Sequence, residues 1–137
     1  MSLNQTTLPN GFRIVTEHME GLASASIGIW VNAGARHETP LQNGIAHFLE
    51  HMAFKGTATR TSLQIAEAIE DVGGYINAYT SREVTAYYVR VLENDVALGL
   101  DVIADILRNP VLDPAEVEVE RGARDWSGAR HARRCDL

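Results

Sequence analysis

A chain of 137 residues can bury the core of one domain, and it is too short for several domains. Its 45% hydrophobic and 22% charged residues are ordinary for a soluble globular protein and imply no membrane class. The net charge of −6 argues against a nucleic acid as partner, because phosphate binding needs a basic surface.

The amino-terminal residues and the cysteine count suggest a compartment. Residues 1–5 lack both the apolar run of a secretory signal and the arginine-rich pattern of a transit peptide, so we expect a cytoplasmic protein. The single cysteine, Cys135, cannot form an internal disulfide. The sequence therefore does not call for an oxidising compartment.

The first third of the chain predicts β-structure. Residues 6–17 read as a hairpin, because Asn10 and Gly11 tolerate the positive φ angles of a tight turn. Alternating apolar residues over 22–33 predict a further strand. We expect these strands to be antiparallel.

Two helices follow a loop at 34–42. Asn43 is the predicted N-cap of the first, which carries residues 47–51 and ends before Lys55-Gly56-Thr57. Thr61 and Gln64 have the spacing of a capping box ahead of a second helix over 62–71. Its expected apolar face consists of Leu63, Ile65, Ala66 and Ile69.

A second hairpin and two more helices complete the pattern. Residues 75–80 and 84–92 alternate strongly and predict the hairpin. A third helix, capped by Asn94 or Asp95, is predicted to run to about residue 107. Its expected core stripe consists of Val96, Leu100, Ile103 and Leu107. Asp113 and Pro114 then open a fourth helix, so the fold class is α+β, an antiparallel sheet with helices on one face.

Residues 47–51, His-Phe-Leu-Glu-His, carry the clearest chemical signal. On a helix His47, Glu50 and His51 gather on one side, and two histidines one turn apart can bind the same ion. The opposite side is expected to be an apolar stripe of Ile45, Phe48, Leu49 and Met52. H-x-x-E-H is the order of the inverted zinc peptidases. The alternative is three solvated polar residues on an exposed helix face.

The sequence segments around this motif resemble those of a known family. Residues 43–57 and 73–83, in this order, resemble the M16 metallopeptidases, which include the processing-peptidase beta subunit, pitrilysin and insulin-degrading enzyme. The similarity is strongest to the small bacterial processing-peptidase-like members and runs from about residue 3 to about residue 122. It implies the metallohydrolase domain of these enzymes, in which several domains surround the substrate like a clam shell. This chain would span the first part of one such domain.

The resemblance also implies roles for residues. His47 and His51 would bind Zn²⁺, and Glu50 would take the proton from the attacking water. Asn77 and Ala78 would lie on an edge strand that pairs with an extended peptide substrate, although they could be ordinary strand residues. A second M16 subunit could complete a dimer or heterodimer.

The third ligand of the family is a glutamate, and the matching position here is Ser127. The family's preceding, supporting glutamate does match Glu120. His131 or Cys135 could supply a replacement ligand, since both donor types suit zinc. Alternatively a glutamate of the fourth helix could turn toward the ion: Glu116, Glu118 or Glu120.

A change of composition near Gly122 suggests two segments, residues 1–121 of family type and an aberrant arginine-rich tail over 122–137. Residues 121–137 carry a local charge of +3, and the preceding 120 residues carry −9. The acidic body could favour basic peptides. A shifted reading frame after Gly122 is one hypothesis for the tail, which sequencing of the gene tests, and it predicts that the tail is disordered or poorly packed.

The sequence thus predicts a zinc-dependent endopeptidase, impaired in this chain because the third ligand is missing. Two other classes stay open. One is a non-catalytic M16 subunit with a binding or structural role. The other is a lyase of the ribosylhomocysteine type, which shares the H-x-x-E-H order and uses a cysteine as third ligand.

Overall fold

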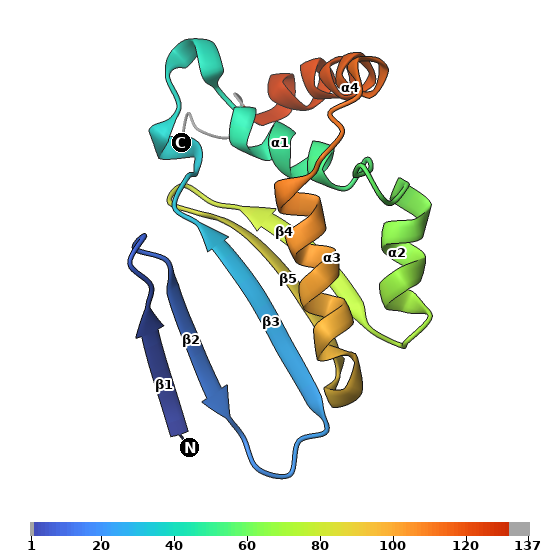
Figure 1. Cartoon of the computed structure of the whole chain (residues 1–137). Helices are drawn as coiled ribbons and strands as arrows, with labels where there is room; N and C mark the ends of the chain where they lie inside the picture. Colours follow the sequence, from blue (N-terminus) through green and yellow to red (C-terminus); the bar gives the residue numbers. More distant parts are fainter. Residues whose placement is uncertain (1, 132–137) are drawn as a thin grey trace.

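A computed structural model describes the backbone of residues 2–131 and the side chains of residues 2–122. Three strands, two helices, two strands and two further helices follow one another along the chain (Figure 1). The strands are β1 (Ser2–Thr7), β2 (Arg13–His18), β3 (Ser24–Val31), β4 (Tyr75–Thr80) and β5 (Thr85–Leu92). The helices are α1 (Ile45–Ala53), α2 (Ser62–Glu70), α3 (Val96–Arg108) and α4 (Pro114–His131), with short 3-10 turns at Ala35–His37, Pro40–Gln42 and Glu93–Asp95.

The strands pair antiparallel, as the alternation of the sequence predicts, but they form two sheets rather than one. β1 and β2 make a separate hairpin, and the other strands make a sheet in the order β3-β5-β4. Helices α1, α2 and α3 lie on one face of the three-stranded sheet, and α4 lies against α1 (Figure 1). The predicted α+β class with helices on one face is confirmed. Among the described residues, no helix combines the length and apolar character needed to cross a bilayer.

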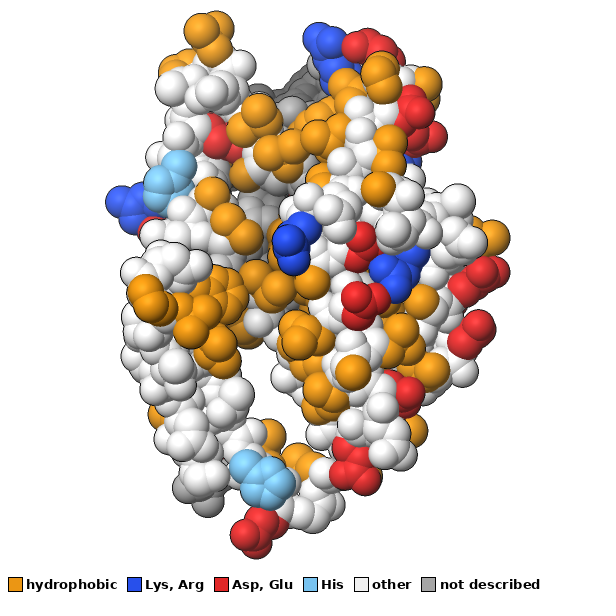
Figure 2. All heavy atoms as spheres, in the orientation of Figure 1, with side chains coloured by type: hydrophobic (Ala, Val, Ile, Leu, Met, Phe, Trp, Pro, Cys, Tyr) orange, Lys and Arg blue, Asp and Glu red, His pale blue; other side chains and the backbone are white. Residues whose placement is uncertain are grey.

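The core lies between the three-stranded sheet and helices α2 and α3. Its buried residues are Ala53, Ile65, Ile69, Tyr87, Val89, Val91, Val102, Ile103 and Ile106. Apolar side chains also remain exposed on the strands, among them Ile14 and Trp30, and hydrophobic atoms occupy much of the surface in Figure 2.

Three predicted apolar stripes are wrong in part. On α2, Ile65 and Ile69 are buried, but Leu63 is 65% exposed. On α1, Met52 is fully buried, whereas Ile45 and Leu49 are more than two-fifths exposed.

On α3, Ile103 is fully buried and Val96 and Leu107 pack against the core, as predicted. Leu100 is half exposed, however, and Gly99 and Val102 face the core instead. The cause is Gly99, where a Cβ atom would lie 3.0 Å from Val89 and 3.4 Å from Val91. The missing side chain lets α3 approach β5 closely, so this side of the helix packs although the glycine adds nothing to an apolar pattern.

The predicted capping box of α2 is confirmed, since Thr61 accepts a hydrogen bond from the Gln64 amide (3.2 Å) and Gln64 accepts one from the Thr61 amide (2.9 Å). α4 begins at Pro114 as predicted, and Asp113 accepts from the Ala115 amide at 2.7 Å.

The predicted N-cap of α1 is wrong. The cap position is Gly44, with a φ of 82°, rather than Asn43. The acceptor comes from the preceding loop, because the Glu38 carboxylate accepts hydrogen bonds from the amides of Gly44 and of Ala46, the latter at 2.8 Å. A negative charge therefore sits at the positive end of the α1 dipole.

The loop after α1 is fastened to α3 by one buried carboxylate. Asp105 is 7% exposed, and its Oδ2 accepts hydrogen bonds from the Thr57 hydroxyl (2.7 Å), the Thr59 hydroxyl (2.8 Å) and the Arg60 guanidinium (2.8 Å). Its Oδ1 accepts from the side-chain amide of Asn109 at 2.9 Å. These bonds, those from Asn109 and Thr57 above all, hold the pKa of Asp105 well below its usual range.

The Glu38 cap can be tested by substitution. We expect Glu38→Ala to lower the free energy of unfolding by about 1 kcal/mol, the usual cost of a lost N-cap. Urea unfolding followed by circular dichroism measures this. Glu20→Ala, at an exposed loop glutamate, is the control, and an equal loss in both variants would show that Glu38 does not cap α1.

The Asp105 cluster gives a second prediction. We expect Asp105→Asn to lower the free energy of unfolding at pH 7 by about 2–3 kcal/mol, because Arg60 and two hydroxyls lose a buried anionic acceptor. The depressed pKa means that this stabilisation is present above the unfolded-state pKa of about 3.9 and is lost as pH falls further. The gap between wild type and variant should therefore narrow below about pH 4 in urea titrations.

The matched control is Asp101→Asn, which removes the exposed second partner of Arg60. We expect it to cost less than about 1 kcal/mol. Equal losses in the two variants would contradict the assignment of Asp105 as the anchor.

Candidate metal centre

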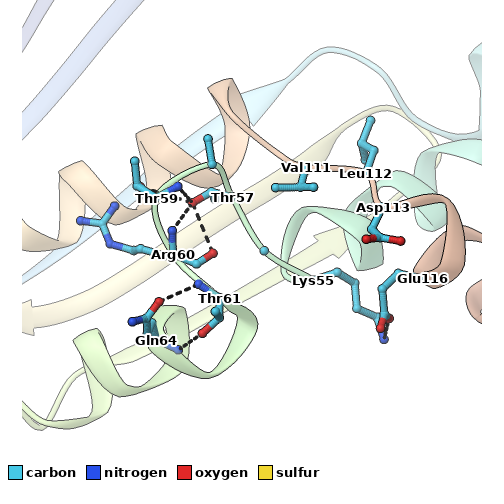
Figure 3. Close-up of a pocket in the computed structure, with 12 residues that line it drawn as sticks. Lys55, Thr57, Thr59, Arg60, Thr61, Gln64, Val111, Leu112, Asp113 and Glu116 are labelled. Atoms are coloured by element: carbon cyan, nitrogen blue, oxygen red, sulfur yellow. Dashed lines mark hydrogen bonds and ion pairs between the residues drawn. The ribbon is translucent and has the colours of Figure 1, made fainter.

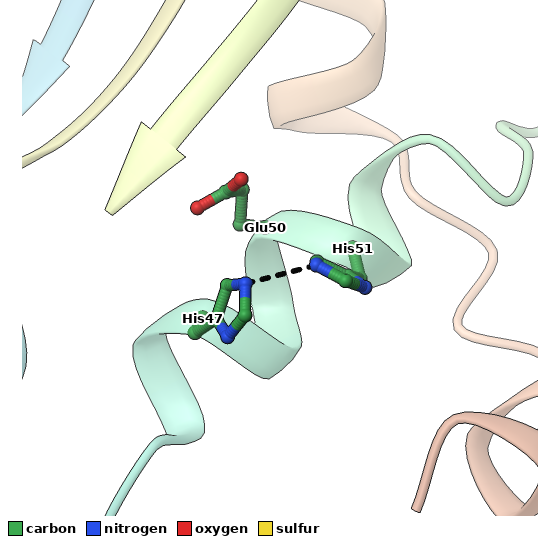
Figure 4. Close-up of side chains that lie close together, drawn as sticks. All are labelled: His47, Glu50 and His51. Atoms are coloured by element: carbon green, nitrogen blue, oxygen red, sulfur yellow. Dashed lines mark hydrogen bonds between the residues drawn. The ribbon is translucent and has the colours of Figure 1, made fainter. Parts of the chain in front are cut away.

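The three polar residues of α1 lie together as their spacing predicts. The Nε2 atoms of His47 and His51 are 2.9 Å apart, and their rings meet edge to face (Figure 4). One Glu50 carboxylate oxygen completes a group whose potential ligand atoms all lie within 4.8 Å of one another. Both histidines are exposed, and Glu50 is half-buried. Because the Nε2 atoms of both imidazoles point to the same place, one ion could bind to both.

This arrangement fits zinc. A tetrahedral ion bound at about 2.0–2.1 Å would separate two nitrogen ligands by roughly 3.3 Å. The observed 2.9 Å between the Nε2 atoms is a few tenths shorter, a difference that small ring rotations remove. Imidazole nitrogen is also a preferred donor for zinc, so His47 and His51 could supply two of the three protein ligands of an open site.

Glu120 of α4 lies behind His51. Its Oε1 is 2.6 Å from Nδ1 of His51, and its side chain is only 15% exposed. A carboxylate that accepts a hydrogen bond from Nδ1 keeps the proton on that nitrogen and leaves Nε2 free to bind a metal. Glu120 therefore stands where a supporting residue would, on the far side of the ring from His47, and in this arrangement it is not a ligand.

The other glutamates of α4 are engaged elsewhere. Glu116 lies 3.2 Å from the Lys55 ammonium, and Glu118 pairs with Arg121 at 2.9 Å. Within residues 2–122 the only ligand cluster is the one formed by His47, Glu50 and His51.

The remaining predicted ligand positions cannot be placed as side chains. The backbone of α4 is helical to His131, so Ser127 and His131 lie in a helix, but their side chains fall outside the described residues. Cys135 and the end of the arginine-rich tail fall outside them altogether.

Thr80 and Tyr87 surround Glu50, and the sequence reading missed both. The Thr80 hydroxyl, at the end of β4, donates a hydrogen bond to Oε2 of Glu50. Burial, and next the negative charge of Glu50, raise the pKa of Tyr87 to about 12, so this phenol stays neutral. The alternation of side chains along β4 could have indicated Thr80, because it places Thr80 on the same face of the strand as Ala78.

Asn77 and Ala78 lie on β4, the edge strand of the three-stranded sheet. Ala78 packs against the core on the helical face, whereas the Asn77 side chain is exposed on the opposite face. The side-chain amide of Asn77 donates to the Tyr75 hydroxyl (2.5 Å), and its Oδ1 accepts from the backbone amide of Ala78 (2.8 Å). The side chain of Asn77 thus accepts a hydrogen bond from a backbone N–H of the edge strand.

A cavity of about 450 Å³ lies between the loop at 55–61 and the segment at 111–116, and other residues line it (Figure 3). Lys55 and Glu116 border it, and none of His47, Glu50 and His51 does. The candidate metal centre is therefore a surface site, separate from this cavity.

Comparison with known proteins identifies relatives of the chain. The model of the insulinase family (Peptidase family M16) matches residues 13–128. A zinc protease of Streptomyces coelicolor is 49% identical over 122 residues, which cover 89% of this chain and 27% of the relative. The mitochondrial-processing peptidase subunit beta of Blastocladiella emersonii is 49% identical over 116 residues, 85% of this chain and 25% of the relative.

A solved structure agrees with these matches. The crystal structure of a protease from Helicobacter pylori superposes with a TM-score of 0.83 at 28% identity, over 89% of this chain and 30% of that chain. The chain thus spans about a quarter of the length of the curated relatives named above.

The contact between Glu120 and His51 predicts an effect on metal binding. We expect Glu120→Gln to weaken zinc binding at least about tenfold, as loss of a charged outer partner of a ligand histidine does. Competition with a chromogenic chelator measures the affinity. Glu118→Gln is the matched control, because this exposed glutamate lies on the same helix and contacts Arg121 instead. Equal zinc affinities in the two variants would exclude a supporting role for Glu120.

Proposed function

The chain belongs to the insulinase family of M16 peptidases, and from this premise we propose that it is the metal-binding part of a zinc-dependent endopeptidase. The observation that carries the proposal is the 2.9 Å approach of the His47 and His51 Nε2 atoms, with the Glu50 carboxylate beside them. Zinc is the metal of this family, and these donors suit it.

His47 and His51 would hold the ion, and Glu50 would act as the general base. Bound zinc supplies a Lewis acid that polarises the scissile carbonyl. A carboxylate oxygen of Glu50 lies within 4.8 Å of the histidine nitrogens, so it can accept the proton of the attacking water. The hydroxyl of Thr80 holds Oε2 and thereby limits rotation of the carboxylate. Glu120 keeps the His51 ring in place from behind.

The substrate in this proposal is an extended peptide that adds to the edge of β4. Edge strands bind through backbone hydrogen bonds, which do not depend on the peptide's sequence. β4 contacts α1, so a peptide paired with the strand would run close to the histidines. It would also have to displace the Asn77 side chain from the amide of Ala78.

Charge favours basic peptides as substrates. The first 120 residues carry a net charge of −9, and on the face shown in Figure 2 acidic side chains lie mainly over the helical half of the molecule. One relative is named as a subunit of a processing peptidase, which supports a second M16 subunit as a partner.

A second candidate function is a non-catalytic M16 subunit that binds peptides or a partner. The observation in its favour is that the ligand cluster among the described side chains contains two histidines and, apart from the proposed base Glu50, no third donor. A centre with two imidazoles would bind zinc more weakly than a three-ligand site, and we propose that this chain by itself hydrolyses peptides slowly. No relative named above supports the lyase alternative.

The general base can be tested directly. We expect zinc-loaded protein to cleave a quenched-fluorescent peptide rich in arginine, and Glu50→Gln to lower kcat/KM at least about 100-fold, because the proton acceptor is lost. Glu67→Gln, at an exposed glutamate of α2, is the control and should retain full activity. Turnover that survives Glu50→Gln would exclude Glu50 as the base. Zinc binding without turnover in the wild type would favour the non-catalytic subunit.

A further inference from the structure

Two pairs of side chains face each other where α1 ends and α4 passes it. Lys55 follows His51 by four residues, about one helical turn, and its amide donates to the Met52 carbonyl at 3.1 Å. On α4, Glu116 and Glu120 are likewise one turn apart. Contacts run from His51 to Glu120, and from Lys55 to both glutamates.

Glu120 is the residue that these contacts share. Its Oε1 lies 2.6 Å from Nδ1 of His51, and its Oε2 lies 3.8 Å from the ammonium of Lys55. Because the carboxylate is 15% exposed, water solvates it little, and the lysine is the cation that compensates its charge. A cation on Oε2 also favours the rotation of the carboxylate that leaves Oε1 directed at the imidazole.

The backbone around Lys55 is held in place independently of these side chains. Gly56 accepts a hydrogen bond from the amide of Val111 at 3.1 Å, and Thr57 forms a bridge with Pro110. Thr57 is in turn bound to the buried Asp105. The loop that carries Lys55 is therefore joined to the segment that leads into α4, and Figure 3 shows Lys55 and Glu116 extending toward each other from the two sides.

We propose that Lys55 is a positioning residue of the metal centre: by binding Glu120, it keeps the carboxylate on Nδ1 of His51 and so keeps Nε2 of His51 available to the ion. The proposal rests on the proposed function only in naming zinc as the ion. It follows that loss of the lysine changes the state of a ring that it does not touch.

The direct test is the tautomer of His51 in the metal-free chain, read from long-range proton–nitrogen NMR spectra of the 137-residue protein with labelled histidine. In the wild type we expect the proton on Nδ1 of His51. In Lys55→Met we expect a larger fraction with the proton on Nε2, and about 3- to 10-fold weaker zinc binding, below the loss for direct removal of an outer partner. Lys55→Arg, which retains the cation, should restore both.

Glu116→Gln separates positioning from simple attachment of α4. This variant removes the stronger contact of Lys55 and leaves the contact with Glu120. If Lys55 acts through Glu120, the His51 spectrum of Glu116→Gln stays as in the wild type. If Lys55 only ties the two helices together, Glu116→Gln and Lys55→Met alter the spectrum alike, and the proposal is overturned.

A double variant guards against misfolding as the cause. In the Glu120→Gln background, Lys55→Met should have no further effect on the His51 tautomer or on zinc affinity. An additive effect overturns the proposal, and so does an unchanged His51 spectrum in Lys55→Met. Because the tautomer is read without metal or substrate, these outcomes are distinguishable from failure of the proposed peptidase function, which the Glu50→Gln assay reports.

Discussion

The candidate metal centre depends on how the two ends of α1 are held. A nine-residue helix is shorter than the roughly 12–15 residues that a helix needs to be stable by itself in water. Met52 and Ala53, in the last turn of this helix, are its buried residues. Polar contacts also hold its two ends: Glu38 binds the first amides, and Asp105 fixes the loop that follows. The spacing of the two histidine nitrogens is thus set by a helix that is stabilised from outside.

The side chains that surround the three polar residues come from distant parts of the chain. Thr80 reaches Glu50 from the end of β4, and Glu120 reaches His51 from α4. Each of the two carboxylates near the histidines therefore has at least one oxygen bound to a residue outside its own helix. Such contacts reduce the rotamers open to the carboxylates, which is the physical meaning of a preorganised site.

Local sequence patterns predicted correctly those features that depend only on residues close together in the sequence. The Thr61 and Gln64 capping box, the start of α4 at Pro114 and the gathering of His47, Glu50 and His51 all follow from helical spacing.

The features that the sequence missed depend on contacts between distant residues. Glu38 caps α1 from a loop six residues before Gly44, and the known capping motifs span only about three residues. α3 turns Gly99 toward the sheet, where a Cβ atom would lie 3.0 Å from Val89, and leaves Leu100 half exposed. Thr80 acquires its role only because the edge strand lies beside α1. Topology, rather than propensity, decided each of these.

The position of Glu120 bears on the ligand that the described residues do not supply. Because its Oε1 is bound to Nδ1 of His51, turning it toward Nε2 would break that hydrogen bond and leave the lysine without one of its partners. Zinc would gain a ligand, but the His51 ring that binds it would lose its hydrogen bond to Glu120. The same carboxylate therefore cannot serve both ends of the imidazole, and a third ligand must come from another residue. Ser127, about two helical turns beyond Glu120, offers a hydroxyl, and neutral hydroxyls are not among the usual protein ligands of zinc. Among the described side chains, two imidazoles are thus the ligands available to the ion, which makes the orientation of His51 the quantity that matters most.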